Sequence, residues 1–325
     1  MNKSKLISIT PLRDAIFQYS RSYSNWGSDY SITQLIRPPR VVQLEKRYAE
    51  YLDKLPFTDD KMKKTLASFK GTAIHKHIES SLWRYMNQNA NAGYLMERRI
   101  WDRILDRKIS GKFDCYRNGA LYDYKTTSVW KRIFGQFDEY EKQLNLYAYL
   151  LGTCGVEVSI LFIIAWYMDW DKHKRYQKDY PSDEVEQIHI SNLWNKKEQE
   201  EYLYLLINRQ KENENKPDDE LDKCTPEDMW AKDTTYAVTY PGATRAVRVK
   251  NSYKEADEYI ADAKKTEKSK KKREAMESWF VETRSGERPR CSDYCSVNIF
   301  CNQYREYCEE QGLEVPDAKA ALEES

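Results

Sequence analysis

The sequence predicts an α/β protein with a mixed central sheet flanked by helices and a C-terminal cysteine-containing extension. Two observations carry this prediction. Between residues 72 and 168, a helix, three strands, a second helix and an apolar strand follow one another, an order typical of a mixed sheet covered by helices. Aromatic residues make up 13% of the 325 residues, with only 11 glycines and 10 prolines, which favours a structured globular protein.

The elements of this core follow from local patterns. Apolar side chains recur at helical spacing over residues 72–86 and predict a helix there. The longest apolar run, 158–168, predicts a buried strand, because it is too short to span a bilayer. The other predicted elements are strands at 93–105, 107–117, 119–127 and 184–194 and helices at 140–151 and 196–213.

The composition changes from residue 216 onward. We therefore expect a core domain with an N-terminal helical segment over 1–215 and an extension over 216–325. In the extension, a hairpin turning at Pro241-Gly242 and one charged helix over 253–279 precede a group of cysteines.

The overall charge is nearly balanced, with 53 lysines and arginines against 52 aspartates and glutamates. This excludes a protein that coats nucleic acid through a global positive charge, although a local basic channel stays possible. The N-terminus lacks the apolar core of a secretory signal. We therefore expect a cytoplasmic protein with no membrane partner.

A predicted hairpin brings two aspartates together. The dipeptide Asn118-Gly119 favours a two-residue type I′ turn, and counting back from it places Asp114 directly opposite Asp123. Lys125 follows two residues later and projects from the same side. Opposed carboxylates repel, and a divalent cation between them would remove the repulsion. An ordinary exposed hairpin is the alternative interpretation.

Two residue pairs elsewhere have the same spacing on predicted helices. His75 and Glu79 lie four residues apart, as do Gln143 and Tyr147, so each pair shares one helix face. This spacing also suits plain packing. In the chain, His75 and Glu79 precede the hairpin, and Gln143 and Tyr147 follow it. This order favours a site shared by the two pairs and the hairpin.

The ordered series G-x-x-x-H, G-x-x-D, D-x-K and Q-x-x-x-Y resembles the RecB-type exonuclease branch of the PD-(D/E)XK nucleases. The resemblance covers roughly residues 31–168 and implies a restriction-endonuclease-like core. The matching residues are Gly71, His75, Gly111, Asp114, Asp123, Lys125, Gln143 and Tyr147.

The resemblance also implies a metal centre. One or two Mg²⁺ or Mn²⁺ ions would be held by His75, Asp114, Asp123 and the backbone carbonyl of Tyr124. Glu79 would support His75 or act as an outer ligand.

The remaining motif residues would act on the substrate. Lys125 would orient the attacking water or stabilise the transition state, and an ordinary lysine pKa of about 10.4 favours the electrostatic role. Gln143 and Tyr147 would contact the substrate strand and brace the site.

Three cysteines crowd together near the C-terminus. Cys291, Cys295 and Cys301 need a fourth ligand for a closed metal site, and Cys224 and Cys308 are the candidates. In a reducing compartment such a group more often binds metal than forms disulfides, and buried thiols are the other alternative.

RecB-type relatives often carry a [4Fe–4S] cluster held by one cysteine before the core and three after it. Here Pro38 occupies the early position and the first late spacing is one residue longer, so Zn²⁺ is an alternative. The layout resembles phage-encoded members of the group, which favours Cys224 as the fourth ligand. Cys115 and Cys154 are expected in the core.

Together these features predict a metal-dependent DNA exonuclease of phage recombination, replication or repair, in the host cell cytoplasm. Its partners would be DNA ends or single strands, with a helicase or single-strand annealing protein. A structure-specific or single-strand endonuclease and a catalytically silent DNA-binding adaptor are the alternatives. A lysine-rich run at 264–273 could contact the DNA backbone or be an ordinary solvated helix face. An aromatic, cationic stretch at 166–176 could stack on unpaired bases, or its aromatic residues could belong to the core.

Overall fold

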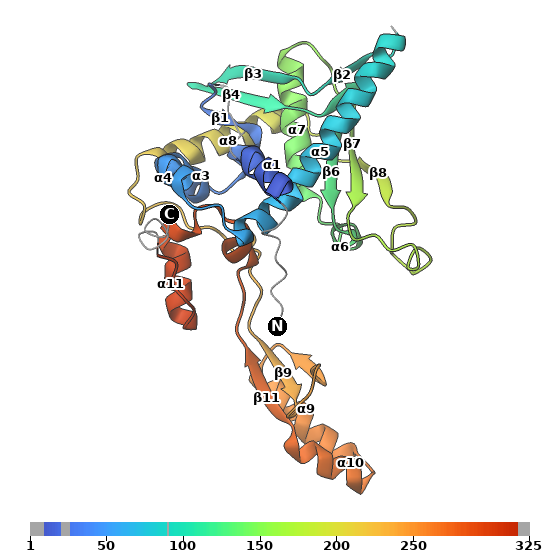
Figure 1. The fold of residues 1–325 in the computed structure, drawn as a ribbon, viewed down its shortest axis with the longest axis vertical. Helices are drawn as coiled ribbons and strands as arrows, with labels where there is room; N and C mark the ends of the chain where they lie inside the picture. Colours follow the sequence, from blue (N-terminus) through green and yellow to red (C-terminus); the bar gives the residue numbers. More distant parts are fainter. Residues whose placement is uncertain (1–9, 21–26, 90, 318–325) are drawn as a thin grey trace. The chain divides into compact units, whose positions relative to one another are not determined.

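The computed structural model describes residues 10–20, 27–89 and 91–317, which fall into two compact units (Figure 1). The first unit ends at Asp222 and the second begins at Lys223. Among the residues described, no helix has the length and apolar character needed to span a bilayer.

The end of the first unit lies beyond the boundary predicted at residue 215. That position falls just after α8 (Lys196–Glu214). The segment that follows stays with the first unit because the buried Arg40 guanidinium donates hydrogen bonds to the carbonyl groups of Asp218, Leu221 and Asp222.

The core of the first unit is a five-stranded mixed sheet. β6 and β7 pair in parallel, and the other neighbouring strands pair antiparallel. This confirms the predicted mixed sheet. In spatial order its strands are β2 (Tyr94–Met96), β5 (Cys115–Arg117), β6 (Ala120–Thr127), β7 (Ile160–Tyr167) and β8 (Val185–Ile190).

The predicted strands at 93–105 and 107–117 are wrong in their continuity, because each divides between two sheets. β2 and β5 belong to the central sheet. β3 (Arg99–Ile104) and β4 (Arg107–Lys112) instead pair antiparallel in a second sheet, where β1 (Tyr30–Ser31) lies parallel to β4.

The chain passes between the two sheets at Glu97 and Asp114. Glu97 has a φ of +49°, which interrupts the extended backbone of the predicted strand. Its N–H donates to the carbonyl oxygen of Asp114 at 2.9 Å, and Phe113, the neighbour of Asp114, is buried. Two acidic residues therefore lie side by side where the sheets part.

Helices cover both faces of the central sheet. α7 (Asp138–Thr153) lies on the face of β6 that carries Asp123 and Lys125, and α5 (Asp59–Gln88) lies on the face that carries Tyr124. Figure 1 shows both helices running along the sheet. The residues of β6 thus present alternate side chains to two different helices.

α5 begins earlier than the predicted residue 72. The Thr58 hydroxyl accepts a hydrogen bond from the Lys61 N–H at 3.2 Å and caps the helix there. The other helices of this unit are α1 (Thr10–Ser20), α2 (Ile32–Ile36), α3 (Pro39–Arg47), α4 (Ala49–Lys54) and α6 (Val129–Ile133).

The main apolar core lies between the central sheet, α7 and α8. Leu121 and Ile163 of the sheet pack with Leu146 of α7 and Leu206 of α8 in one buried cluster. Cys115 is buried as expected. The expectation for Cys154 is wrong: this residue is exposed, because it follows the end of α7.

The second unit contains a three-stranded antiparallel sheet of order β10-β9-β11. The predicted hairpin pairs β9 (Thr235–Thr239) with β10 (Arg248–Lys250). Its predicted turn at Pro241-Gly242 is present, with the Ala243 N–H donating to the Tyr240 carbonyl at 3.1 Å, but it lies within a longer loop over 240–247. β11 (Phe280–Arg284) is a strand that the sequence pattern did not predict.

The charged helix predicted over 253–279 is also divided. α9 (Tyr253–Thr266) ends before an extended Glu267, and Ser269 then caps α10 (Lys270–Ala275). The chain continues through a π-helical turn (Arg290–Tyr294) and a 3₁₀ turn (Asn298–Phe300) into α11 (Asn302–Gln311).

Candidate active site

The predicted hairpin turn is present at the tip of β5 and β6. Asn118 and Gly119 both have positive φ, 48° and 85°, as a type I′ turn requires. The strand register that follows leaves Asp114 one step beyond the last pair of β5, opposite Asp123. The turn and the strand register are thus as predicted, while the two carboxylates have different partners: His75 and the Tyr124 N–H for Asp114, Lys125 and Gln143 for Asp123.

Asp123 lies in the interior, with its side chain 3% exposed. Lys125 Nζ lies 2.6 Å from Asp123 Oδ2, and Gln143 Nε2 donates to Oδ1 at 3.5 Å. Burial raises the pKa of Asp123 to about 6. Burial also disfavours the charged form of Lys125, but Asp123 outweighs this and the Lys125 pKa lies above its ordinary value.

Gln143 links the motif residues of β6 to those of α7. Its Oε1 accepts a hydrogen bond from Lys125 Nζ at 3.1 Å, and its Nε2 donates to the Tyr147 hydroxyl at 3.0 Å. α7 approaches closely because Gly111 has no side chain. A Cβ there would lie 2.9 Å from atoms of Tyr147 and Leu150.

His75 reaches the hairpin from α5. Its Nδ1 lies 3.5 Å from Asp114 Oδ1, while Asp114 Oδ2 accepts a hydrogen bond from the Tyr124 N–H at 2.7 Å. Gly71 allows this approach, since a Cβ there would lie 2.9 Å from the Thr126 hydroxyl oxygen.

His75 and Asp114 each shift the other's pKa toward the charged form. Burial lowers the pKa of His75, but the hydrogen bond to Asp114 outweighs burial and the pKa is raised. Burial likewise acts to raise the pKa of Asp114, but His75 outweighs it and the pKa is lowered.

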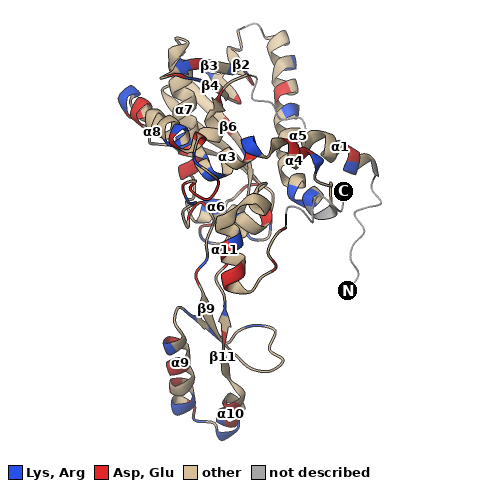
Figure 2. Cartoon of the chain, turned by 90° about the vertical axis from the view of Figure 1, so that its left-hand side faces the viewer, with Lys and Arg blue, Asp and Glu red and all other residues tan. Residues whose placement is uncertain are grey.

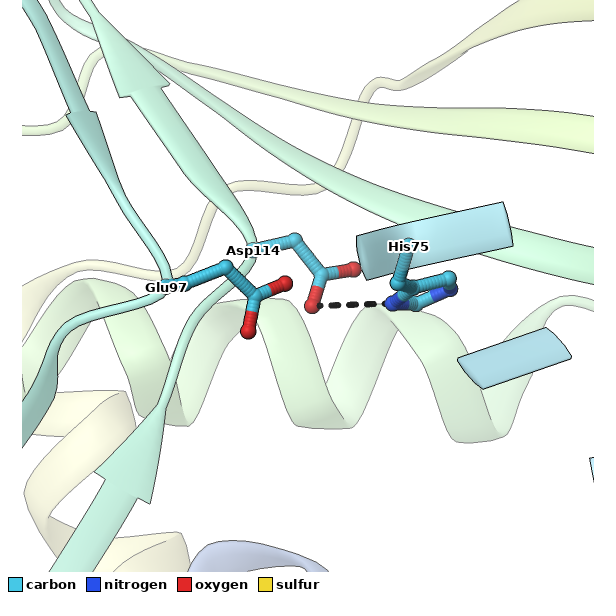
Figure 3. A group of neighbouring side chains, drawn as sticks. All are labelled: His75, Glu97 and Asp114. Carbon is cyan, nitrogen blue, oxygen red and sulfur yellow. Dashed lines mark ion pairs between the residues drawn. The ribbon is translucent and has the colours of Figure 1, made fainter. Parts of the chain in front are cut away.

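Glu97 joins this group, although the sequence analysis did not select it. Ligand atoms of His75, Glu97 and Asp114 all lie within 4.8 Å of one another (Figure 3). One Glu97 oxygen forms an ion pair with Lys112. No sequence signal identifies Glu97, because a strand that places Met96 inward predicts an exposed residue next to it.

Glu79 lies in the neighbourhood but not in contact. Its negative charge contributes to raising the pKa of Glu97, after burial and Asp114. Among the described residues, no hydrogen bond or ion pair joins Glu79 to His75. The expected support of His75 by Glu79 is therefore not made directly.

The donor set fits a hard divalent cation. Glu97 Oε1 and Asp123 Oδ2 are buried oxygens that accept no hydrogen bond within the described residues, although Lys125 Nζ lies close to the second. Carboxylate oxygens and an imidazole nitrogen suit Mg²⁺ or Mn²⁺. The residues present therefore match the cation that the motif series implies.

The four selected cysteines all belong to the second unit. Gln303 fixes Cys224 beside Cys301, because its Oε1 accepts from the Cys224 N–H at 2.8 Å and its Nε2 donates to the Cys224 carbonyl at 2.9 Å. Burial and the neighbouring thiols, Cys301, Cys291 and Cys295 among them, raise the pKa of Cys224 to about 12.

Cys308, the other candidate, is buried on α11 beside Tyr304 and Tyr307. Cys291 is half-buried, and burial with the nearby Cys295 raises its pKa to about 12. Within the described part of the chain, no three of the cysteine sulfurs lie within 4.8 Å of one another. The four predicted ligands are neighbours whose thiols interact electrostatically with Cys224 or Cys291.

The two other stretches with suspected DNA contacts lie in different units. The lysine-rich run spans the end of α9 and α10, where basic residues gather (Figure 2), and Lys264 pairs with Glu277 at 3.1 Å. In the aromatic stretch, Trp166 donates to Glu184 and the buried Tyr167 donates to Glu186. These two aromatic residues thus stabilise the fold through their hydrogen bonds.

No family model matches the chain, and no curated protein matches it. A solved structure of a protein designated SSO0001 is similar at 17% identity, over 64% of this chain and 87% of that one, with a TM-score of 0.43. A protein from Eubacterium rectale that has been proposed to be an exonuclease is similar at 14% identity, over 69% and 90%, with a TM-score of 0.38. Both similarities are too weak to support a conclusion about function, which depends instead on the residues of the site.

Proposed function

We propose that this protein is a divalent-metal-dependent deoxyribonuclease. The observation that supports the proposal best is the convergence of the motif residues. Asp123 and Lys125 from β6, Gln143 from α7, and His75 and Asp114 meet around buried carboxylate oxygens. On the basis of the motif resemblance, we further propose that the enzyme is a phage-encoded exonuclease that acts in recombination, replication or repair.

The residues that would hold Mg²⁺ or Mn²⁺ are His75, Asp114, Asp123 and the carbonyl of Tyr124. The cation would lower the pKa of a bound water and neutralise charge on the attacked phosphate. Asp114 is already oriented by the Tyr124 N–H and by His75. This arrangement holds its carboxylate in the charged form that a cation requires.

Lys125 would act as a fixed positive charge. Its raised pKa keeps the ammonium protonated at neutral pH, so it is a poor base. Gln143 holds the ammonium in place at 3.1 Å. A positioned charge of this kind stabilises negative charge that develops in the transition state.

Tyr147 would brace the site through Gln143. It is 4% exposed, and burial raises the pKa of its hydroxyl, which therefore stays protonated. The direct contact with the substrate strand then belongs to Gln143.

A substrate panel tests the function. Purified protein is incubated with Mg²⁺ or Mn²⁺ and end-labelled linear DNA, single-stranded and duplex, beside circular single-stranded DNA. An exonuclease releases nucleotides from linear DNA and leaves the circle intact, whereas an endonuclease cuts the circle. Binding without any cleavage would support the adaptor alternative and contradict the proposal. The same panel with a helicase or annealing protein added would show a partner requirement.

For the second unit we propose a [4Fe–4S] cluster held by Cys224, Cys291, Cys295 and Cys301, with Zn²⁺ as the alternative. The supporting observation is that Cys291, Cys295 and Cys301 lie close enough to Cys224 to raise its pKa, after burial, and that Cys295 and Cys301 do the same for Cys291. Anaerobically purified protein should show visible absorbance and iron, or stoichiometric zinc without colour. Absence of both metals, or their retention after Cys295→Ala, would contradict the site.

A further inference from the structure

We infer that Glu97 is a ligand of a second divalent cation, which it holds together with His75 and Asp114. The inference rests on the proposed function and extends its metal centre by a residue outside the motif series. Three observations carry it: the isolation of one Glu97 oxygen, the local excess of negative charge, and the position of Asp123.

The Glu97 carboxylate is buried, and among the described residues only one of its two oxygens has a partner. The side chain is 9% exposed, and Oε1 accepts no hydrogen bond from the described residues. Figure 3 shows the carboxylate beside that of Asp114. A buried acceptor without a partner is costly, and coordination of a cation would remove that cost.

The backbone fixes Glu97 to Asp114. The Glu97 N–H donates to the Asp114 carbonyl oxygen at 2.9 Å, at the point where the two sheets part. The two residues cannot move apart without breaking this backbone bond. Their closeness is thus built into the crossing between the sheets.

Negative charge exceeds positive charge around this point. The carboxylates are those of Glu79, Glu97, Asp114 and Asp123, and the lysines that pair with them are Lys112 and Lys125. Glu97 pairs with Lys112 and Asp123 with Lys125, whereas Asp114 has His75 as its ion-pair partner within the described part of the chain. Lys112 is 45% exposed, so it can turn into solvent when a cation binds.

Asp123 belongs to a separate position. Its oxygens face Lys125 and Gln143, and within the described residues it does not join the group of ligand atoms that lie within 4.8 Å of one another. One ion held by His75, Glu97 and Asp114 would therefore leave Asp123 and the Tyr124 carbonyl to the other ion, so that with two ions bound His75 serves only the one held by Glu97. Asp114 would take part in holding both ions, which together would stabilise the attacking and the leaving oxygen.

The rival explanation is that Glu97 serves only as the partner of Lys112. Two matched variants separate the explanations. Glu97→Gln keeps the shape and removes the ligand charge, and Lys112→Ala removes the partner and keeps the ligand. Mn²⁺ binding is counted by electron paramagnetic resonance and calorimetry, on full-length protein without DNA.

We expect two Mn²⁺ ions in the unmodified protein and in Lys112→Ala, and one in Glu97→Gln. Two ions in Glu97→Gln, or equal losses in both variants, would overturn the inference. One ion in the unmodified protein, unchanged in Glu97→Gln, would overturn the inference alone and leave the proposed function standing. No Mn²⁺ binding by any form would overturn both. If Glu97→Gln fails to fold, Glu97→Asp replaces it, and full-strength Mn²⁺ binding there contradicts a ligand role.

A second, independent observation concerns the exposed aromatic pair on α6. The rings of Trp130 and Phe134 stack with centroids 5.9 Å apart and an interplanar angle of 21°, yet the residues are 58% and 66% exposed. Stacked rings open to solvent suit bases that are not paired. We propose that this pair binds unpaired nucleotides of the substrate strand.

The position of α6 ties the pair to the active site. The helix follows β6 directly, and Asp169 accepts hydrogen bonds at its start from Ser128 Oγ at 2.7 Å and the Val129 N–H at 2.8 Å. Lys131, next to Trp130, lies 4.0 Å from the ring centroid of Tyr140, and Lys125 lies 5.0 Å from the same centroid. Lys131 of α6 and Lys125 thus approach the same ring, which brings α6 near the active site.

Binding measurements in a Lys125→Ala background, where cleavage is blocked, test this proposal. Trp130→Ala should weaken binding of a single strand about tenfold and leave a blunt duplex unchanged. Trp101→Ala is the control, because that residue on β3 is 61% exposed. Unchanged single-strand binding, or equal loss for both DNA forms, would overturn the proposal. This readout does not depend on whether the protein cleaves DNA.

Discussion

Asp123 shows how a single buried carboxylate can define a site. With its side chain 3% exposed and Lys125 at 2.6 Å, it is held where a charge is costly without compensation. Burial accordingly raises its pKa to about 6. A bound cation would compete with the proton for this carboxylate, which makes metal binding sensitive to pH.

The first prediction concerns this competition. Below pH 6 a proton must leave Asp123 before a cation binds, and the raised pKa of His75 adds a second proton. Mn²⁺ affinity should therefore fall by at least about tenfold for each pH unit below 6, and level off as pH rises above both pKa values. Calorimetry between pH 5 and 8 measures the slope, and a flat profile would contradict the assignment.

The raised pKa of Asp123 also determines the direction in which the stability of the folded state changes with pH. In the metal-free protein the folded state holds the Asp123 proton up to about pH 6, while the unfolded state loses it near 3.8. The folded state therefore binds more protons between these values, so this group's contribution to stability falls as pH rises through the window. Adding Mn²⁺ should oppose that loss at neutral pH.

At the scale of elements, the contact of α7 with β4 positions the site. Gly111 leaves room for Tyr147 and Leu150, whose atoms would lie 2.9 Å from a Cβ. Gly111→Ala should therefore push α7 away, destabilise the protein by about 1–3 kcal/mol and reduce cleavage. Thermal unfolding and the cleavage assay measure both effects.

Gly152, which lies on α7 itself, is the matched control for Gly111 on β4. A Cβ there would meet nothing within 4 Å, and the residue has ordinary helical surroundings in α7. Gly152→Ala should be neutral or stabilise the protein by about 0.5–1 kcal/mol. Equal effects of the two substitutions would show that close packing at Gly111 is not what positions α7.

The elements also show what sequence reasoning can reach. The Asn118-Gly119 dipeptide determines its own turn geometry, so the turn and the register of β5 with β6 could be predicted. The division of the strands could not, because residues 94–105 contain no glycine or proline that would mark a change of sheet at Glu97. Glu97 was missed for the same reason, since its role depends on a backbone crossing rather than on a pattern.

At the scale of the whole molecule, the two units differ in what supports them. The main apolar cluster draws only on residues of the first unit, from Tyr30 to Ile207. The second unit has small clusters around Val238 and Tyr304. Small cores commonly need a metal or disulfide as support, which agrees with a metal held by the cysteines.

This difference makes a prediction for the fragment 1–222. Because its core is complete without residues 223–317, the fragment should unfold cooperatively and bind Mn²⁺ as the full chain does. In the full chain, Cys295→Ala, which removes a proposed cysteine ligand, should leave Mn²⁺ binding by the first unit unchanged. A fragment that is unfolded, or that has lost Mn²⁺ binding, would show that the first unit does not form its site alone.

The central claim is that the buried carboxylates and Lys125 form a metal-dependent nuclease site. The most direct measurement is nucleotide release from end-labelled linear DNA, with and without Mn²⁺, by the unmodified protein, Asp123→Ala and Lys125→Ala. We predict release by the unmodified protein only with metal, and a loss of about 100-fold or more in each variant, with folding retained in circular dichroism. Release that is independent of metal, or that persists in both variants, would contradict the account.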